Sequence, residues 1–429
     1  MTTPHKTLTL ALGAAVTGAA VLAAAPAGAA GSEIHVSTRG SDGNAGTATS
    51  PLRTVQAAAD RAKPGTTIRV HGGTYVGEIR IKNSGTASAP ITVTPAGDGA
   101  VTLTSNQSPD SCYSSAPSPR RTIKMLSGAD YWTFKGLNIH HGAYLSGKGS
   151  GKVFSWHAAL VKKKIWQPRR AVPGAGSYNP TAARNAIPYL AKALNTALDP
   201  VVGVKFIDNT ITGRGIFATL TTSGVVQGNR ISKIICGSGP GVWIMNHSNF
   251  WTVTGNDVTD IAISRAAHYM QEGIRFGSAA NYNKITNNKV HDLQGDGRAF
   301  NTDVDSSYNT FEKNFATNVA IGYNDQMAGW NNRWRNNTVT NYRQYGYGYR
   351  LMDASLSLPS MSTSTNGVVS SGNVALHPAR SGAKAMGAGG MMKGTFSGNN
   401  FNTFWISKNL TRYWSSYGNT WNGSPAVPK

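Results

Sequence analysis

The sequence predicts an all-β fold, a right-handed parallel β-helix in which the chain winds into a solenoid of stacked coils. An Asn followed within two residues by a β-branched or apolar residue recurs through the second half, and short runs between these Asn residues alternate apolar and other residues. The repeated positions are Asn209, Asn229, Asn256, Asn288, Asn314, Asn337, Asn373, Asn400 and Asn419. Their average spacing of about 26 residues suits one solenoid coil and is too short for a propeller blade.

Each repeat predicts short strands with a period of two, as expected where one strand face is buried. One strand is expected at 242–245, 274–277 and 300–303, and a second before each Asn, at 251–253, 284–286 and 310–312. About three such strands per coil, stacked on equivalent strands, bury their inner face only against neighbouring coils. The Asn itself suits a turn with left-handed backbone geometry, where its amide can bond to the Asn of the next coil.

Composition and charge limit the class of protein. The 429 residues include 49 glycines, 14% charged and 40% hydrophobic residues, so the chain can bury a large core. Its two cysteines, Cys112 and Cys236, form at most one bridge and supply no metal-binding cysteine cluster. A formal net charge of +22 favours an anionic partner.

The first thirty residues resemble a secretory signal peptide, with a largely apolar run over 8–25 followed by small residues up to Ala30. A membrane anchor is the alternative for this stretch. No later stretch approaches the ~18 uninterrupted apolar residues of a spanning helix. We therefore expect a signal peptide over 1–30 and a single β-helix domain over 31–429, in a secreted, extracellular monomer without a membrane span or a nucleic-acid partner. Export would permit a disulfide between the two cysteines.

The N-terminal segment adds a resemblance. Several short runs look like the opening of pectate-lyase-like right-handed parallel β-helix proteins. These runs lie at 34–37, 40–43, 50–58, 63–68 and 72–75, and a later run at 131–139 looks like a coil of that family. Val55, Ala58, Ala59 and Ala62 fall on one face of a short helix that would cap the open end of the solenoid. A strand over 67–70 starts the first coil. The resemblance implies the fold and a secreted polysaccharide-lyase type, although this architecture also carries glycoside hydrolases and phage tail spikes.

One region interrupts the coils. From Tyr131 through Leu198 there is no Asp or Glu, while seven Lys and three Arg occur. We interpret about 143–198 as a basic, partly helical insertion over one side of the solenoid, with a helix near 186–198 indicated by apolar residues at helical spacing. Such a segment either attracts a polyanion or is a solvated surface.

Aligning the repeats on their Asn residues predicts three columns of outward side chains. The first holds Trp243, Arg275 and Asn301, with Arg350 added by pattern; the second holds Met245, Gly277 and Asp303; the third holds His247, Ala279 and Asp305. Because stacked strands lie ~4.8 Å apart, Arg275 and Asp303 are expected to share one groove.

Carboxylates concentrate in the same region. Nine of the nineteen acidic residues fall within 69 residues: Asp257, Asp260, Glu272, Asp292, Asp296, Asp303, Asp305, Glu312 and Asp325. Asp303 and Asp305, two apart on a strand, face one side and either hold Ca²⁺ or do acid/base work on a sugar. The alternative for these carboxylates is ion pairing for stability.

Aromatic side chains suit the apolar faces of pyranose rings. Six follow the acidic cluster: Trp330, Trp334, Tyr342, Tyr345, Tyr347 and Tyr349. In the strand alternation, Trp334 and Tyr349 fall at inward-facing positions, which predicts that they are core residues. We expect the substrate to be bound by Trp243, His247, Asn301, Tyr345 and Tyr347, although an outward histidine is often only a surface residue.

These features predict a polysaccharide lyase that cleaves a uronic-acid polymer by β-elimination. Arg275 and Arg350 would clamp the uronate carboxylate, and Ca²⁺ on Asp303 and Asp305 would assist. In similar β-helix lyases an Arg or Lys serves as the base. One alternative is a glycoside hydrolase using Asp303, Asp305 and Asp325 as acid and base. Another is a non-catalytic β-helix that binds an anionic glycan.

Overall fold

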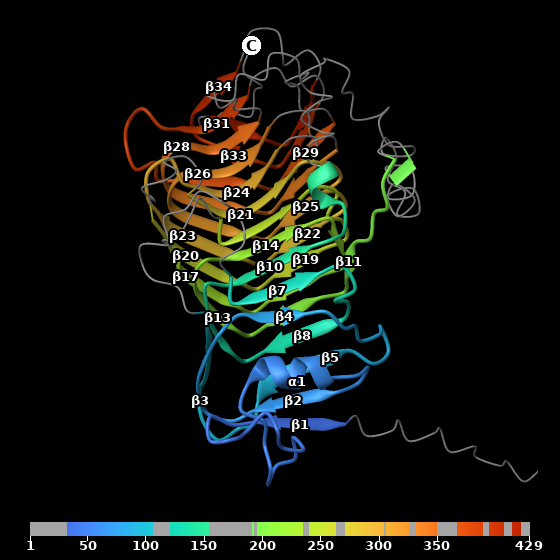
Figure 1. Ribbon diagram of the computed structural model, residues 1–429. Helices are drawn as coiled ribbons and strands as arrows, with labels where there is room; N and C mark the ends of the chain where they lie inside the picture. The colour runs from blue at the N-terminus through green and yellow to red at the C-terminus, as the bar shows by residue number, and fades with distance from the viewer. Residues whose placement is uncertain are drawn as a thin grey trace, which may run out of the picture. The chain divides into compact units, whose positions relative to one another are not determined.

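A computed structural model shows the predicted architecture, a right-handed parallel β-helix (Figure 1). It describes residues 32–105, 121–153, 191–192, 195–234, 240–262, 271–303, 306–326, 329, 331–349, 367–388, 394–406 and 414–421, which belong to the compact unit Ser32–Lys429. In this part of the chain no helix has the length and apolar character needed to cross a membrane.

Equivalent strands of successive coils pair in parallel and form three rows. The first row is β1 (Glu33–Val36), β2 (Thr67–Val70), β5 (Ile91–Pro95), β8 (Trp132–Lys135), β12 (Lys205–Ile207), β16 (Val225–Gln227), β19 (Thr252–Thr254), β22 (Lys284–Thr286), β25 (Thr310–Glu312), β27 (Arg333–Arg335), β29 (Val368–Ser371), β32 (Gly394–Ser397) and β35 (Trp414–Tyr417).

The second row is β3 (Gly73–Val76), β6 (Val101–Thr104), β9 (Asn138–His140), β13 (Thr210–Gly213), β17 (Arg230–Ile234), β20 (Asp257–Ile261), β23 (Lys289–Leu293), β26 (Phe315–Asp325), β28 (Thr338–Tyr349), β30 (Val374–Leu376), β33 (Asn400–Phe401) and β36 (Thr420–Trp421). The third row is β4 (Ile79–Ile81), β7 (Ile123–Leu126), β10 (Ala143–Ser146), β14 (Ile216–Thr219), β18 (Val242–Met245), β21 (Glu272–Gly277), β24 (Arg298–Thr302), β26, β28, β31 (Lys384–Ala388) and β34 (Phe404–Ile406). The long strands β26 and β28 run through both rows, and β11 (Val201–Val202) pairs separately with β15 (Thr221–Thr222).

The strands follow the alternation in the sequence. The predictions at 67–70, 242–245, 284–286 and 310–312 are confirmed at the predicted bounds, while β21 and β24 each begin two residues earlier than expected. Inward positions of one row stack from coil to coil: the rings of Phe300, Tyr323 and Tyr347 follow each other at 5.1 and 4.8 Å. The interior is therefore a continuous column of side chains, in which each coil covers the next.

The predicted capping helix is α1 (Val55–Arg61), at the blue end of Figure 1. The Thr54 hydroxyl accepts a hydrogen bond from the Ala57 amide at 3.1 Å and so caps the first turn. Val55, Ala58 and Ala59 are buried in the same core as the first coils. The helix thus covers apolar side chains that no preceding coil covers.

The repeated Asn residues form a buried ladder, as predicted. Each side-chain oxygen accepts bonds from the backbone N–H and the Nδ2 of the preceding Asn, for example Asn256 to Asn288 at 3.0 and 2.8 Å. The ladder runs through Asn209, Asn229, Asn256, Asn288, Asn314, Asn337, Asn373, Asn399 and Asn419. Two details of the prediction are wrong. Asn399 replaces the expected Asn400, and the left-handed residue is the one before the Asn, as at Asp208 and Gly228.

The basic insertion begins later than expected. β10 pairs with β7 and β14 in the third row, so the predicted boundary at residue 143 is wrong, because residues 143–146 belong to the solenoid. Residues 154–190 and most of the helix expected at 186–198 lie outside the described residues, as do the signal peptide expected over 1–30 and both Cys112 and Cys236.

Adjacent residues offer a matched test of the ladder. Asn399 is buried and exchanges bonds with Asn373, Ser370 and Asn419, whereas Asn400 is exposed. Asn399→Ala leaves several buried polar groups without partners and should lower the free energy of unfolding by roughly 2–3 kcal/mol. Asn400→Ala should change it little. Urea unfolding of both variants measures the difference, and equal losses would contradict the ladder's role.

Candidate functional site

The outer face of the third row carries the residues that the alignment grouped. Trp243 pairs with Arg275, and Arg275 pairs with Asn301, so the first predicted column is confirmed. The column continues through Asn324, Gly348 and Gly387. Arg350 was predicted for this column, but that prediction is wrong because Gly348 holds the position; Arg350 itself, like Asp305, lies outside the described residues.

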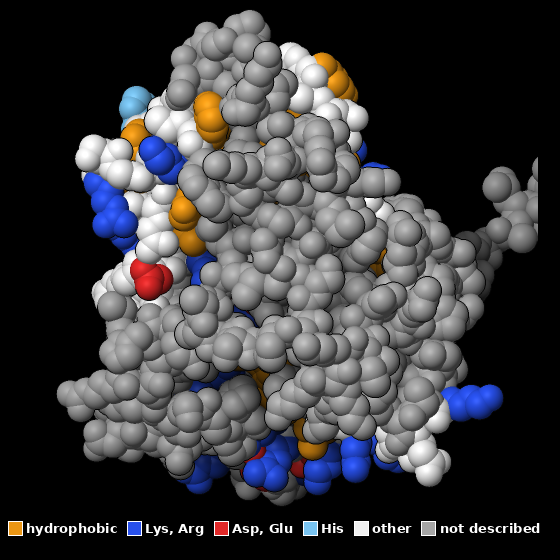
Figure 2. Space-filling model, turned by 90° about the horizontal axis from the view of Figure 1, so that it is seen from above, with side chains coloured by type: hydrophobic (Ala, Val, Ile, Leu, Met, Phe, Trp, Pro, Cys, Tyr) orange, Lys and Arg blue, Asp and Glu red, His pale blue; other side chains and the backbone are white. Residues whose placement is uncertain are grey.

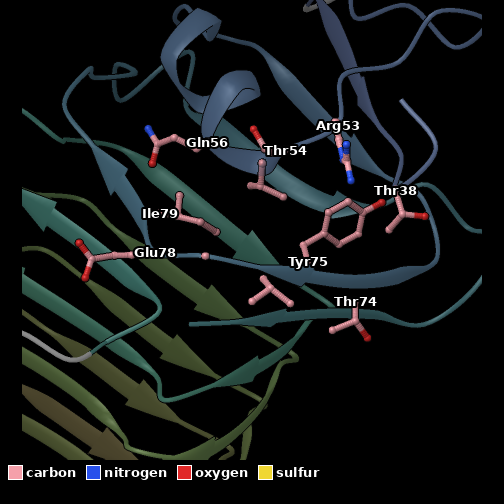
Figure 3. A pocket seen from close by; sticks show the side chains of 11 residues that line it. Thr38, Arg53, Thr54, Gln56, Thr74, Tyr75, Glu78 and Ile79 are labelled. Carbon is pink, nitrogen blue, oxygen red and sulfur yellow. The ribbon is translucent and has the colours of Figure 1, made fainter. Parts of the chain in front are cut away.

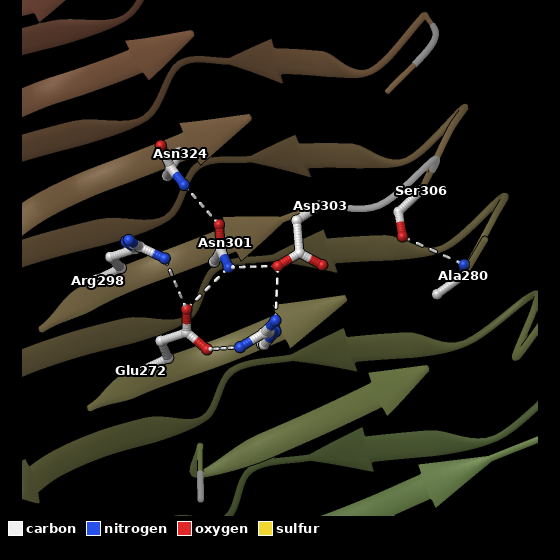
Figure 4. Close-up of polar contacts among 8 residues, drawn as sticks. Glu272, Ala280, Arg298, Asn301, Asp303, Ser306 and Asn324 are labelled. Carbon is white, nitrogen blue, oxygen red and sulfur yellow. Dashed lines mark hydrogen bonds and ion pairs between the residues drawn. The ribbon is translucent and has the colours of Figure 1, made fainter. Parts of the chain in front are cut away.

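Arg275 is held between two carboxylates (Figure 4). Its Nη1 bonds the Glu272 carboxylate at 2.8 Å, and its Nη2 bonds Asp303 Oδ2 at 2.7 Å from the next coil. The same Glu272 carboxylate accepts bonds from Asn301 Nδ2 at 2.8 Å and Arg298 Nη1 at 3.3 Å. We call these five residues the Arg275 network. The expected proximity of Arg275 and Asp303 is thus confirmed.

The Arg275 network is largely closed to solvent, which the sequence did not predict. Asp303 and Glu272 side chains are 1% exposed, Asn301 is 0% exposed, and the Arg275 side chain is 11% exposed. Burial disfavours a charged Arg275, but the charges of Asp303 and Glu272 outweigh it and raise its pKa, so Arg275 stays protonated. Burial raises the pKa of Asp303 against the opposing charge of Arg275. Arg275 is therefore a fixed cation and not a base.

Several buried polar atoms around the Arg275 network have no hydrogen-bond partner. They are Asp303 Oδ1, Trp243 Nε1, Asn324 Oδ1 and Gln326 Oε1. Native proteins leave few such atoms, and a cluster of them needs an explanation. Asp303 Oδ1 lies over Gly277, where a Cβ atom would approach it to 2.6 Å, so glycine is required for this position of the carboxylate.

An aromatic series leads along the same face to Arg275. Tyr144, Phe217 and Trp243 occupy the column position on three successive coils. Tyr144 and Phe217 stack at 5.5 Å, Phe217 meets Trp243 edge-on at 4.8 Å, and the Arg275 guanidinium lies 5.3 Å from the Trp243 ring centre. Tyr144 and Phe217 were missed because the alignment started at later coils.

The predicted aromatic binding residues divide between the two faces. Trp334 and Tyr349 are core residues, as expected. Tyr347 was predicted to bind substrate, but this is wrong: it is 0% exposed, and its hydroxyl donates to the Asn337 carbonyl inside the coil at 2.7 Å. Tyr345 is half-buried, and its ring lies against Gly387 of the column, so it remains a candidate.

Two further candidates lie inside the protein. His247 is 2% exposed, and burial lowers its pKa to about 4, so it is a neutral buried side chain rather than an outward one. Asp325 aligns with Thr302 and accepts a bond from the indole of the core residue Trp334 at 3.1 Å. It therefore faces the interior, on the opposite side of the sheet from Arg275.

The described residues include only part of the expected Ca²⁺ site. No three His, Cys, Asp or Glu side chains among them gather where they could share a metal ion. Asp303 offers one uncommitted oxygen, while its other oxygen contacts the cationic Arg275. The expected Ca²⁺ site on Asp303 and Asp305 stays a prediction, because Asp305 lies outside the described residues.

A pocket of about 430 Å³ lies elsewhere, at the N-terminal end between α1 and strands β3 and β4 (Figure 3). Its lining includes Thr54, Tyr75, Arg53 and Glu78. Glu78 already pairs with Arg80 and with Lys124, which leaves the pocket without an uncommitted carboxylate among the residues that line it. On the face shown in Figure 2, Lys and Arg are more frequent than Asp and Glu among the described side chains, in keeping with the net charge of +22.

Comparisons with known proteins agree with this architecture. Residues 34–158 match the family described as Pel9A-like, right handed beta helix region. The pectate lyase PEL9 of Emericella nidulans is 37% identical over 117 residues, which are 26% of this chain and 28% of that protein. The match therefore spans little more than a quarter of the curated relative.

Solved structures resemble a larger part of the chain. A rhamnogalacturonan lyase has a TM-score of 0.50 at 14% identity, with 86% of this chain and 87% of that chain covered. A glycoside hydrolase has a TM-score of 0.50 at 13% identity, with 93% and 97% covered. At these identities the likeness shows the fold alone.

Removing the cation from the Arg275 network should be costly in a pH-dependent way. Arg275→Met leaves Asp303 buried without a counter-charge and Glu272 with only Arg298, at 3.3 Å, so we expect a loss of about 3–5 kcal/mol in the free energy of unfolding. The loss should shrink from about pH 8 to about pH 5, because without Arg275 the pKa of Asp303 rises further and its protonation removes a buried charge. Urea unfolding at both pH values measures this.

Arg69→Met is the matched control, since Arg69 pairs with Glu33 at 2.9 Å with both side chains well exposed. It should alter stability little at either pH. A loss for Arg275→Met that does not depend on pH would contradict the account of the network.

Proposed function

We propose that this chain, a pectate-lyase-like right-handed parallel β-helix protein, is a secreted polysaccharide lyase that cleaves a uronic-acid polysaccharide by β-elimination. The proposal depends on one observation, that the carboxylates of the outer face are already engaged in ion pairs. Both Glu272 and Asp303 bond Arg275, so the face presents a permanently charged cation rather than an open pair of acids. The partial match to a pectate lyase and the net charge of +22 support it.

The same geometry argues against hydrolysis by Asp303 together with Asp325, whereas Asp305, the other carboxylate expected for hydrolysis, lies outside the described residues. A glycoside hydrolase needs two carboxyl groups on either side of the scissile bond, about 5–9.5 Å apart. Among the described residues, Asp325 faces the interior and bonds Trp334, so it does not share a sugar with Asp303. Asp303 alone does not provide the acid and the base.

Elimination places different demands on the site. The uronate carboxylate must be neutralised so that the proton on the adjacent ring carbon becomes acidic, and a base must remove that proton. We assign the first role to Arg275, which is fixed in place and protonated. We assign the second to Asp303, because its Oδ1 has no partner and its pKa is raised by burial, which makes it a stronger base than an ordinary aspartate.

The electrons of the broken C–H bond form a carbon–carbon double bond as the bond to the glycosidic oxygen breaks, and the departing oxygen takes up a proton from water to become a hydroxyl group. Trp243 and Tyr345 supply ring faces on which neighbouring sugars can stack. Asp305 remains a proposed contributor to a Ca²⁺ site, and we derive no step through the metal.

Incubation of the protein with polyuronates tests the reaction class. Pectate, alginate, glucuronan and glycosaminoglycans are compared with neutral glycans, with and without a chelator. A lyase produces an unsaturated product conjugated with the carboxylate, so ultraviolet absorbance should rise with at least one polyuronate and with no neutral glycan. New reducing ends without a rise in absorbance would instead establish hydrolysis.

Asp303→Asn tests the assignment of the base. The amide keeps the shape of the side chain but does not accept the proton, so the rate of elimination should fall by about 100- to 10,000-fold. Substrate binding should persist. Because Asp303 also holds Arg275, unfolding of the variant is measured in parallel, and a folded variant with undiminished elimination would remove Asp303 from the mechanism.

A further inference from the structure

Two to four coils before the Arg275 network, the third row carries a second group of cationic side chains. Arg121, His141 and Arg214 each precede by two residues the strand positions Ile123, Ala143 and Ile216, which pair with one another. Glu272 stands in the same relation to Ile274. We call Arg121, His141 and Arg214 the upstream basic cluster.

Arg121 is buried with two of its three guanidinium nitrogens unpaired. It is 3% exposed, and its Nε and Nη1 atoms have no hydrogen-bond partner. None of the ion pairs among the described residues involves Arg121. Burial and the nearby charge of Arg214 lower its pKa to about 9. Burying a charge without a partner is expensive, so such a group normally has a ligand or a counter-ion.

The neighbours of Arg121 add further binding capacity. Arg214 is 2% exposed and lies close enough for the two positive charges to repel each other. The Nδ1 atom of His141 is buried and has no partner. Arg121, Arg214 and His141 thus lie close together, and no ion pair links Arg121 to a carboxylate of the described residues, whereas Arg275 has two such pairs.

The place of the cluster on the face indicates the kind of anion. Tyr144 belongs to the aromatic series that leads to Trp243 and Arg275. It also lies close enough to Arg121 to raise the pKa of that guanidinium. The upstream basic cluster and the Arg275 network are therefore connected by ring faces along one row. The coil spacing of about 4.8 Å is close to the advance of one sugar ring along an extended polymer.

We propose that Arg121, Arg214 and His141 form a subsite that binds the carboxylate of a uronic-acid residue, one or more sugars away from the residue at Arg275. The inference rests on the proposed function for the identity of the polymer. A bound carboxylate provides acceptors for the unpaired Arg121 nitrogens and offsets the repulsion between the two arginines. The subsite selects acidic over neutral sugars before the reacting residue reaches Arg275.

The test uses the full-length protein carrying Asp303→Asn, so that the ligand is not consumed. Binding of pectate and alginate oligomers, and of neutral oligosaccharides of the same length, is measured by calorimetry with and without Arg121→Met. We expect Arg121→Met to weaken binding of one oligouronate by about 10- to 100-fold and to leave the weak binding of neutral oligomers unchanged. Arg39→Met, which removes an exposed arginine, controls for the loss of one positive charge.

A second measurement separates a ligand site from an internal structural contact. Without ligand, Arg121→Met should unfold at the same or a higher temperature, because an unpaired buried charge is removed. With oligouronate, the stabilisation seen in the parent should largely disappear. A variant that unfolds at a lower temperature without ligand and binds oligouronate as the parent does would overturn the proposal, since Arg121 would then have a partner within the protein.

Failure of this subsite is distinguishable from failure of the proposed function. If polyuronate elimination occurs and Arg121→Met changes neither binding nor KM, the subsite is refuted while the lyase assignment stands. If no polymer gives an unsaturated product but oligouronate binding depends on Arg121, the reaction class is wrong while the subsite stands.

Discussion

The register between coils is the constraint on which the outer face depends, and the Asn ladder maintains it. Each ladder residue is buried and uses its side-chain oxygen and nitrogen in bonds to adjacent coils, so a shifted coil would leave several polar groups without partners. Arg275 and Asp303, 28 residues apart in sequence, come within 2.7 Å only because their coils lie in this register.

The two charged groups on this face follow opposite electrostatic designs. In the Arg275 network, two protein carboxylates surround a single guanidinium, which fixes its position and keeps it charged. In the upstream basic cluster, the described residues leave Arg121 without such a partner. A polyanion lying along the face would meet first a region that gains from its charge and then a protonated guanidinium held in a fixed position. Binding and chemistry would thus be separated along one polymer.

The sequence predicted the fold well and the candidate site only in part. The spacing of the Asn residues was sufficient to align Trp243, Arg275 and Asn301, because strand positions repeat faithfully between ladder residues. It failed for Arg350 because that position was assigned from a similar local motif, whereas the pairing of β26 with β28 places Gly348, two residues earlier, opposite Asn324. The alternation of apolar and polar residues along the strands also did not reveal that the Arg275 network is buried. Burial of an outward side chain depends on which neighbouring segments cover it.

The spacing of the ladder residues, which ranges from 20 to 36, has an evolutionary consequence. Extra residues within a coil leave its ladder bonds intact, so the chain can acquire or lose segments between strands without disturbing the frame. Recognition elements beside the outer face can then diversify while the internal scaffold is inherited unchanged. Such a protein family would be expected to diverge in specificity faster than in backbone.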